Sequence, residues 1–291
     1  VGYIVIAKIL MPLYYKLNVV SIYQYLEQRF GKISYKTGAS FFILSRTLGS
    51  AVRLYLATMV LHYFLLGDLG LSYWMTAVIT ILLIWIYTFK GGIKTIVYTD
   101  TFQTFFLISS VIICTVIIGK ILGLDFSQMY AAIGEMKTKH DTSLTKLLYL
   151  DDYKSHLFFP KQFFGGMFIA IAMTGLDQDM MQKNLTCKTL GDAQKNMYSF
   201  TTVLVITNSL FLLLGGALYL YSTQLQIDLP MRDGKVITDH VFPHLALNEF
   251  PKIGWIGTVA GSFFLLGIIA SSYASADSAL AALTTGFCID F

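Results

Sequence analysis

Charged residues are scarce in this chain. They make up 13% of its 291 residues, whereas hydrophobic residues make up 55%, and the mean hydropathy is +0.64. A soluble domain needs more charge than this to cover its surface. Because the apolar residues also gather in long runs, the composition indicates an integral membrane protein. The formal net charge of +4 is then a signal of membrane topology and not of nucleic-acid binding.

Residues that build metal centres and catalytic clusters are also few. The three cysteines, Cys114, Cys187 and Cys288, lie far apart, so neither a disulfide framework nor a zinc site is indicated. Two of the five histidines, His240 and His244, have HxxxH spacing, but no cysteine or third histidine lies near them in the sequence. The sequence contains no nucleophile elbow and no phosphate loop. We therefore expect that the chain is not an enzyme.

Seven apolar runs have the length of a membrane-spanning helix, which needs about 20 residues to cross about 30 Å of hydrocarbon. All should be helices, because an open strand would leave backbone groups without hydrogen bonds in lipid. The predicted spans cover residues 1–15, 38–66, 71–89, 94–122, 160–180, 197–222 and 253–287. The chain begins inside the first run and ends just after the last. We therefore expect residues 1–291 to be a single transmembrane domain taken from a longer protein.

The loops between these spans alternate in charge. Residues 16–36, 90–93 and 181–195 are rich in lysine and arginine, whereas aspartates match the lysines in the loops at 123–159 and 223–252. Loops with excess positive charge stay on the cytoplasmic side. We predict a multi-pass protein of the plasma membrane (the inner membrane in a bacterium), with the first three loops in the cytoplasm. Within the last loop, the apolar spacing of "DHVFPHLALNEFP" predicts a short helix over the mouth of the bundle.

The last span carries many small polar residues. On a helical wheel, one face holds only small residues, namely Gly267, Ser271, Ala274, Ser275, Ser278 and Ala282. One interpretation is a packing seam, because small residues let helices approach closely. The other is a site for a monovalent cation, because hydroxyl oxygens are hard, neutral ligands. Asp277 lies on the flank of this face, where it could complete a second ion site or hold a neighbouring helix.

Two further acidic segments lie at predicted cytoplasmic helix ends. Asp100 is six residues beyond Lys94, roughly 9 Å along the helix axis. It is either an interfacial acid favoured by the helix N-terminus or an ion-linked group, which its polar neighbours favour. Asp177 and Asp179 either pair with lysines of the following loop, Lys183 or Lys188, or form part of a cytoplasmic gate.

Four segments together resemble the sodium/solute symporter family, which includes sodium–glucose, proline and sialic acid transporters. They are "MPLYYKLNVVSIYQYLEQRFG", "GGIKTIVYTDTFQT", "DQDMMQKNLTCKTLGDAQK" and "ASADSALAALTTGFCID", in the family's order. The resemblance implies an all-α, leucine-transporter-like bundle of two intertwined, inverted five-helix repeats. The seven spans would be core helices two to eight of ten.

The resemblance also implies ion ligands. A common sodium site would take oxygens from Ser271, Ala274 and Ser275, although Ala274 lacks the hydroxyl that the family pattern has there. A second sodium site, present in some members, would use Asp100, Asp277 and Ser278.

The solute is less well indicated. The family's sugar transporters carry an asparagine and a tyrosine where this chain has Ala170 and Met173, so a sugar pocket of that kind is not expected. Met173, Thr174 and Asn208 are candidates to face the cavity.

The predicted function is sodium-coupled symport of a small organic solute by alternating access. Two alternatives remain open. One is a transporter-like sensor module attached to a signalling domain. The other is a proton-coupled carrier in which Asp100 or Asp277 exchanges protons.

Overall fold

The computed structural model describes residues 1–291 except 68, 89–91, 138–141 and 147, and except some helical side chains: those of residues 57, 64, 65, 87, 88, 92–97, 99, 272, 273, 275 and 277. The fold is almost entirely helical, as the sequence predicts. Each of the seven predicted spans is helical over most of its length.

The helices follow the predicted spans closely. The first span is one continuous helix built of α1 (Gly2–Val5), η1 (Ile6–Leu10) and α2 (Met11–Leu17). The next four are α4 (Lys32–Leu61) with η2 (His62–Leu66), α5 (Tyr73–Thr88), α6 (Gly92–Leu122), and α8 (Phe159–Ala170) with η3 (Ile171–Gly175). The last two are α10 (Leu190–Gln224) and α12 (Trp255–Asp290). Between α10 and α12 lie the hairpin β1 (Met231–Arg232) and β2 (Lys235–Val236), then α11 (Thr238–His244), η4 (Leu245–Glu249) and η5 (Phe250–Ile253). The predicted short helix in this loop is thus confirmed.

Membrane-spanning length and hydropathy, taken alone, single out two helical stretches of the described chain. These are Asp100–Leu122 and Leu190–Gln224. Shorter apolar stretches are Tyr73–Ile86, Trp255–Ser271 and Ser278–Asp290.

Three local features differ from the sequence prediction. Helices α3 (Gln24–Phe30) and α7 (Phe126–Glu135) lie in segments expected to be loops. The predicted span at 160–180 is interrupted: η3 ends at Gly175 and α9 (Gln178–Leu185) begins after a two-residue break. The Asp177 side chain caps α9 by accepting a hydrogen bond from the Met180 amide at 3.2 Å. Interrupted helices of this kind occur in transporters at ion and solute sites.

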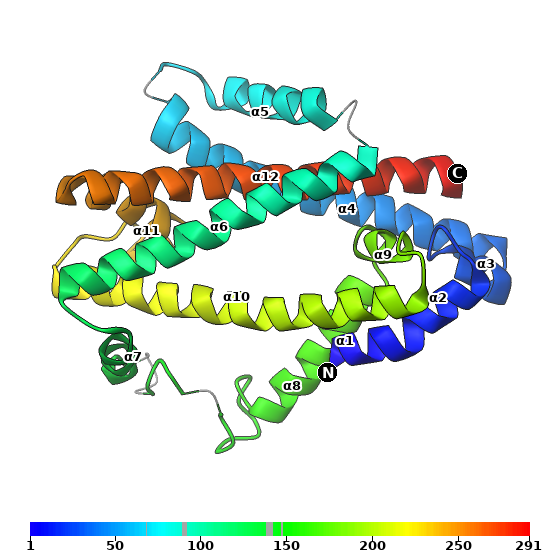
Figure 1. Ribbon diagram of the computed structural model, residues 1–291, viewed down its shortest axis with the longest axis horizontal. Coiled ribbons are helices and arrows are strands. Elements are labelled where there is room, and N and C mark those ends of the chain that lie inside the picture. Colours follow the sequence, from blue (N-terminus) through cyan, green and yellow to red (C-terminus); the bar gives the residue numbers. More distant parts are fainter. Residues whose placement is uncertain (68, 89–91, 138–141, 147) are drawn as a thin grey trace.

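The helices form two groups (Figure 1). In the α12 group, α12 packs along α6 and α4, and α5 packs on α4. In the α10 group, α10 packs against α1, η1 and α2, and α8 lies on α1. Helix α6 crosses obliquely from α12 to the far end of α10 (Figure 1), and α9 touches both α10 and α12. Residues of both groups line the cavities described below.

The elements predicted to be cytoplasmic lie together at one end of the molecule. Helix α3, the start of α10 and the end of α12 gather there, whereas α7 and α11 lie at the other end (Figure 1). The buried Asp290 carboxylate ties this end together, because it accepts hydrogen bonds from Ser21 Oγ at 2.9 Å and from the Tyr35 hydroxyl at 2.8 Å. Gln178 of α9 joins the same segment through the Ile22 amide and the Val20 carbonyl, at 2.9 and 3.0 Å.

Candidate functional site

Three cavities follow one another along helix α4. The outer cavity, of about 690 Å³, lies beside the β1–β2 hairpin and α11, the middle one has about 520 Å³, and the inner one has about 390 Å³. The outer and middle cavities share Leu56, Met59 and Asp239. The middle and inner cavities share Arg53, Leu107 and Ser271. Neighbouring cavities therefore share walls, and the three lie in a row along α4.

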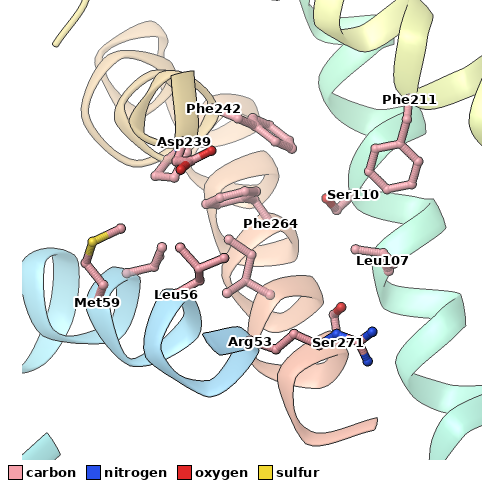
Figure 2. A pocket seen from close by; sticks show the side chains of 13 residues that line it. Arg53, Leu56, Met59, Leu107, Ser110, Phe211, Asp239, Phe242, Phe264 and Ser271 are labelled. Carbon is pink, nitrogen blue, oxygen red and sulfur yellow. The ribbon is translucent and has the colours of Figure 1, made fainter. Parts of the chain in front are cut away.

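The middle cavity has an aromatic wall and polar ends (Figure 2). Phe211 comes from α10, Phe242 from α11 and Phe264 from α12, and the rings of Phe242 and Phe264 lie 4.3 Å apart between centroids. Arg53 and Ser271 lie together at one end, and Asp239 lies beside Phe242 away from them (Figure 2). A mostly apolar cavity of several hundred Å³ with a few polar groups is the usual form of a small-molecule site.

Arg53 is the cationic group of the middle cavity. Its side chain is exposed to the cavity, and among the described residues it has no carboxylate within ion-pair distance. Asp239 lies in the first turn of α11, where the helix N-terminus favours a carboxylate. An intramembrane arginine without an acidic partner is costly unless something else supplies negative charge.

Asp177 and Asp179 meet an arginine of α4 at the inner cavity. Arg46 forms an ion pair with Asp179 and lies 3.9 Å from Asp177, measured from Nη1 to Oδ2. The side chains of Arg46 and Asp179 are only 11% and 4% exposed. The sequence-based expectation that these acids pair with Lys183 or Lys188 is therefore wrong for Asp179, because the fold brings Arg46 closer.

Lys183 instead bridges α6 and α12. Its ammonium nitrogen donates hydrogen bonds to Asp100 Oδ2 at 2.9 Å and to Ser278 Oγ at 2.8 Å. Asp100 and Ser278, distant in sequence, are thus brought to one place, and the extensive packing of α6 on α12 agrees with this. The side chain of Asp277 lies outside the described residues. Sodium binding by this cluster is still a prediction.

The small-residue face of α12 serves two purposes along its length. At Gly267 a Cβ would lie 3.2 Å from the Leu107 Cα, so this part is a packing seam against α6. Further along, Ser271, Ala274 and Ser278 line the inner cavity. The third residue of the predicted common sodium site, Ser275, has its side chain outside the described residues.

The candidate solute residues lie elsewhere. Met173 is 64% exposed and Thr174 is 8% exposed, both in η3, and Asn208 is exposed on α10. None of them is among the described residues that line the three cavities.

Arg46 and Arg53 were not among the residues predicted for the site, and Lys183 was predicted only as a partner of Asp177 or Asp179. The signal for the two arginines was present, because both are ionisable residues inside the predicted span at 38–66. For Lys183, the partners are 83 and 95 residues away, and no local pattern shows such a contact.

The Arg46–Asp179 pair should be important for stability. Replacing Asp179 by Asn leaves the buried arginine with only the more distant carboxylate of Asp177, which should lower the free energy of unfolding of the full-length protein by up to about 3–5 kcal/mol. Thermal unfolding in detergent measures this. Asp151→Asn is the matched control, because Asp151 pairs with Lys146 on the surface. A wild-type unfolding temperature for Asp179→Asn would contradict the contact. Adding Arg46→Gln should recover part of the loss, since it removes the charge that has lost its close partner.

Comparison with known proteins agrees with this architecture. The structure of a Na⁺-coupled sialic acid symporter, described as substrate-bound and outward-open, matches with a TM-score of 0.77 at 23% identity, covering 100% of this chain and 58% of that one. This likeness shows the fold and confirms the predicted transporter architecture.

Curated relatives are similar in sequence over most of this chain. The sodium-coupled monocarboxylate transporter 1 of Xenopus laevis is 26% identical over 97% of the chain, and the sodium/sialic acid symporter SiaT of Proteus mirabilis is 24% identical over 95%. The sodium-dependent multivitamin transporter of Oryctolagus cuniculus is 26% identical over 76%. The chain spans 43%, 52% and 33% of the lengths of these relatives, respectively.

The family model describes the chain from end to end. The model named Sodium:solute symporter family matches residues 1–291. Members of such a family are multi-pass membrane proteins, which agrees with the seven helical spans. This chain therefore belongs to the sodium:solute symporter family.

Proposed function

We propose that the protein containing this chain is a sodium-coupled symporter that moves a small organic anion across the plasma membrane, or the inner membrane of a bacterium, by alternating access. One observation carries the proposal: the three cavities share lining residues along α4, and the charged contacts of α9 lie at the inner one. We infer that the three cavities act as one route, because alternating access requires a binding space that is reached from each side in turn.

Sodium would bind at the inner part of this route. Ser271 and Ala274 line the inner cavity, and Ser275 follows on the same helix. The hydroxyl and carbonyl oxygens of this segment are neutral ligands, which suit a monovalent ion that must bind and then leave. The ion couples to the solute only if both bind the same conformation better than the other one. Ser271 also borders the middle cavity, so ion and solute would occupy neighbouring spaces.

The solute would bind in the middle cavity with its negative charge towards Arg53. The guanidinium group offers planar, paired N–H donors that match a carboxylate. The aromatic wall would cover an apolar part of the solute. The names of two of the relatives fit this charge, since monocarboxylates and sialic acid are anions. Met173, Thr174 and Asn208 would then contribute little to solute binding.

Sodium dependence tests the ion site. Full-length protein in proteoliposomes should take up an organic acid when an inward sodium gradient is imposed at fixed pH. Ser275→Ala removes one oxygen ligand without adding bulk, a loss of about 1–3 kcal/mol. The sodium concentration for half-maximal uptake should rise about 5- to 150-fold. Ser262→Ala, on the same helix but with its hydroxyl bonded to Thr258, should leave it unchanged.

Two results would contradict this proposal. Uptake that follows a proton gradient and ignores sodium would favour the proton-coupled carrier. An unchanged sodium dependence in Ser275→Ala would leave Ser275 as part of a packing seam.

Solute charge tests the role of Arg53. A panel of sialic acid, short monocarboxylates and their uncharged amides should show uptake of one or more acids and of none of the amides. Arg53→Gln should raise KM for the transported acid at least tenfold, because it removes the counter-charge and the paired donors. Arg53→Lys keeps the charge and should retain part of the affinity. Equal KM values for wild type and Arg53→Gln would show that the anion binds elsewhere.

A further inference from the structure

The contact of Lys183 with Asp100 and Ser278 has a consequence for the number of coupling ions. We propose that the Lys183 ammonium serves as a tethered cation at the position of the second sodium site, so that the protein couples transport to a single sodium ion. This inference rests on the proposed sodium-coupled function and specifies its stoichiometry.

The geometry gives Lys183 the place of an ion. Asp100 comes from α6 and Ser278 from α12, and the ammonium nitrogen lies within 2.9 Å of an oxygen of each. An ammonium carries the same single charge as sodium and presents three donors to surrounding oxygens. It therefore contacts one carboxylate oxygen and the hydroxyl in the way that a bound ion would.

Among the described residues that line the inner cavity, each carboxylate already has a cationic partner. This lining includes three cationic side chains, Arg46, Arg53 and Lys183, and two carboxylates, Asp100 and Asp179. Arg46 pairs with Asp179 and Lys183 with Asp100, so the remaining charge is that of Arg53. A sodium ion added beside Asp100 would lie a few ångströms from an ammonium, and like charges at that distance repel strongly.

Unused oxygens show what the cluster could bind without the lysine. Asp100 Oδ1 and Gln103 Oε1 are both buried and have no hydrogen-bond partner among the described residues. The two residues lie one turn apart on α6, and both line the inner cavity with Ser278. Removing the ammonium would leave carboxylate, amide and hydroxyl oxygens in one wall, the ligand type that hard cations prefer.

Counting bound sodium tests the proposal directly. Purified full-length protein should bind one ²²Na⁺ per molecule at saturation. Lys183→Gln, which removes the ammonium, should bind two, and Lys183→Gln combined with Asp100→Asn should return to one. Lys183→Arg keeps a cation in place and should bind one. Lys188→Gln is the matched control, since it removes an exposed lysine from the loop that follows α9, and it should also bind one.

The outcomes distinguish a failure of the tethered cation from a failure of sodium coupling. Two sodium ions on the wild type, or one on a folded Lys183→Gln variant, would overturn the tethered cation. No sodium on the wild type but one on Lys183→Gln would support the tethered cation and contradict sodium coupling. No sodium on either would overturn both. If Lys183→Gln does not fold, Lys183→Met provides the same comparison.

Discussion

The short helix α9 makes the charged contacts on which the arrangement of the two helix groups depends. Arg46 of α4 reaches Asp179, and Lys183 reaches Asp100 of α6 and Ser278 of α12. Because α9 follows a break in the chain and also packs on α10, these contacts connect the two groups across the inner cavity. The Arg46–Asp179 pair is buried, and separating buried charges is costly, so this contact favours the arrangement in which α9 is held against α4.

Helix α4 supplies the continuous wall of the route. Arg46 faces the inner cavity, Arg53 faces the inner and middle cavities, and Leu56 and Met59 face the middle and outer ones. The spacing of these residues places them along one helix face. A relative movement of the two helix groups would therefore change access to the middle cavity from either end, which is the mechanical requirement for alternating access.

Hydropathy predicted the seven spans because lipid imposes a minimum apolar length, and the family resemblance predicted their arrangement. The sequence holds a local signal for α7, where Asp125 and Gln128 form a capping box. It also holds one for Arg53, which is an ionisable residue within an apolar span. The break before α9 was missed because the residues on its N-terminal side, through Leu176, are apolar. The pairing of Lys183 with Asp100 depends on helix packing over long sequence distances, which a single sequence does not encode in any local pattern.

The central claim is that the cavities along α4 form one route whose access depends on sodium. Leu56→Cys in full-length protein, with Cys187 and Cys288 replaced by alanine, places a thiol in the wall of the middle cavity, while the native Cys114 is buried. An impermeant thiol reagent added from outside should react with this cysteine faster in sodium than in choline, and a transported solute should slow the reaction. Leu44→Cys, at an exposed position of α4 that is not among the described cavity-lining residues, should show neither effect. A reaction rate at position 56 that is the same in sodium and in choline would contradict the account.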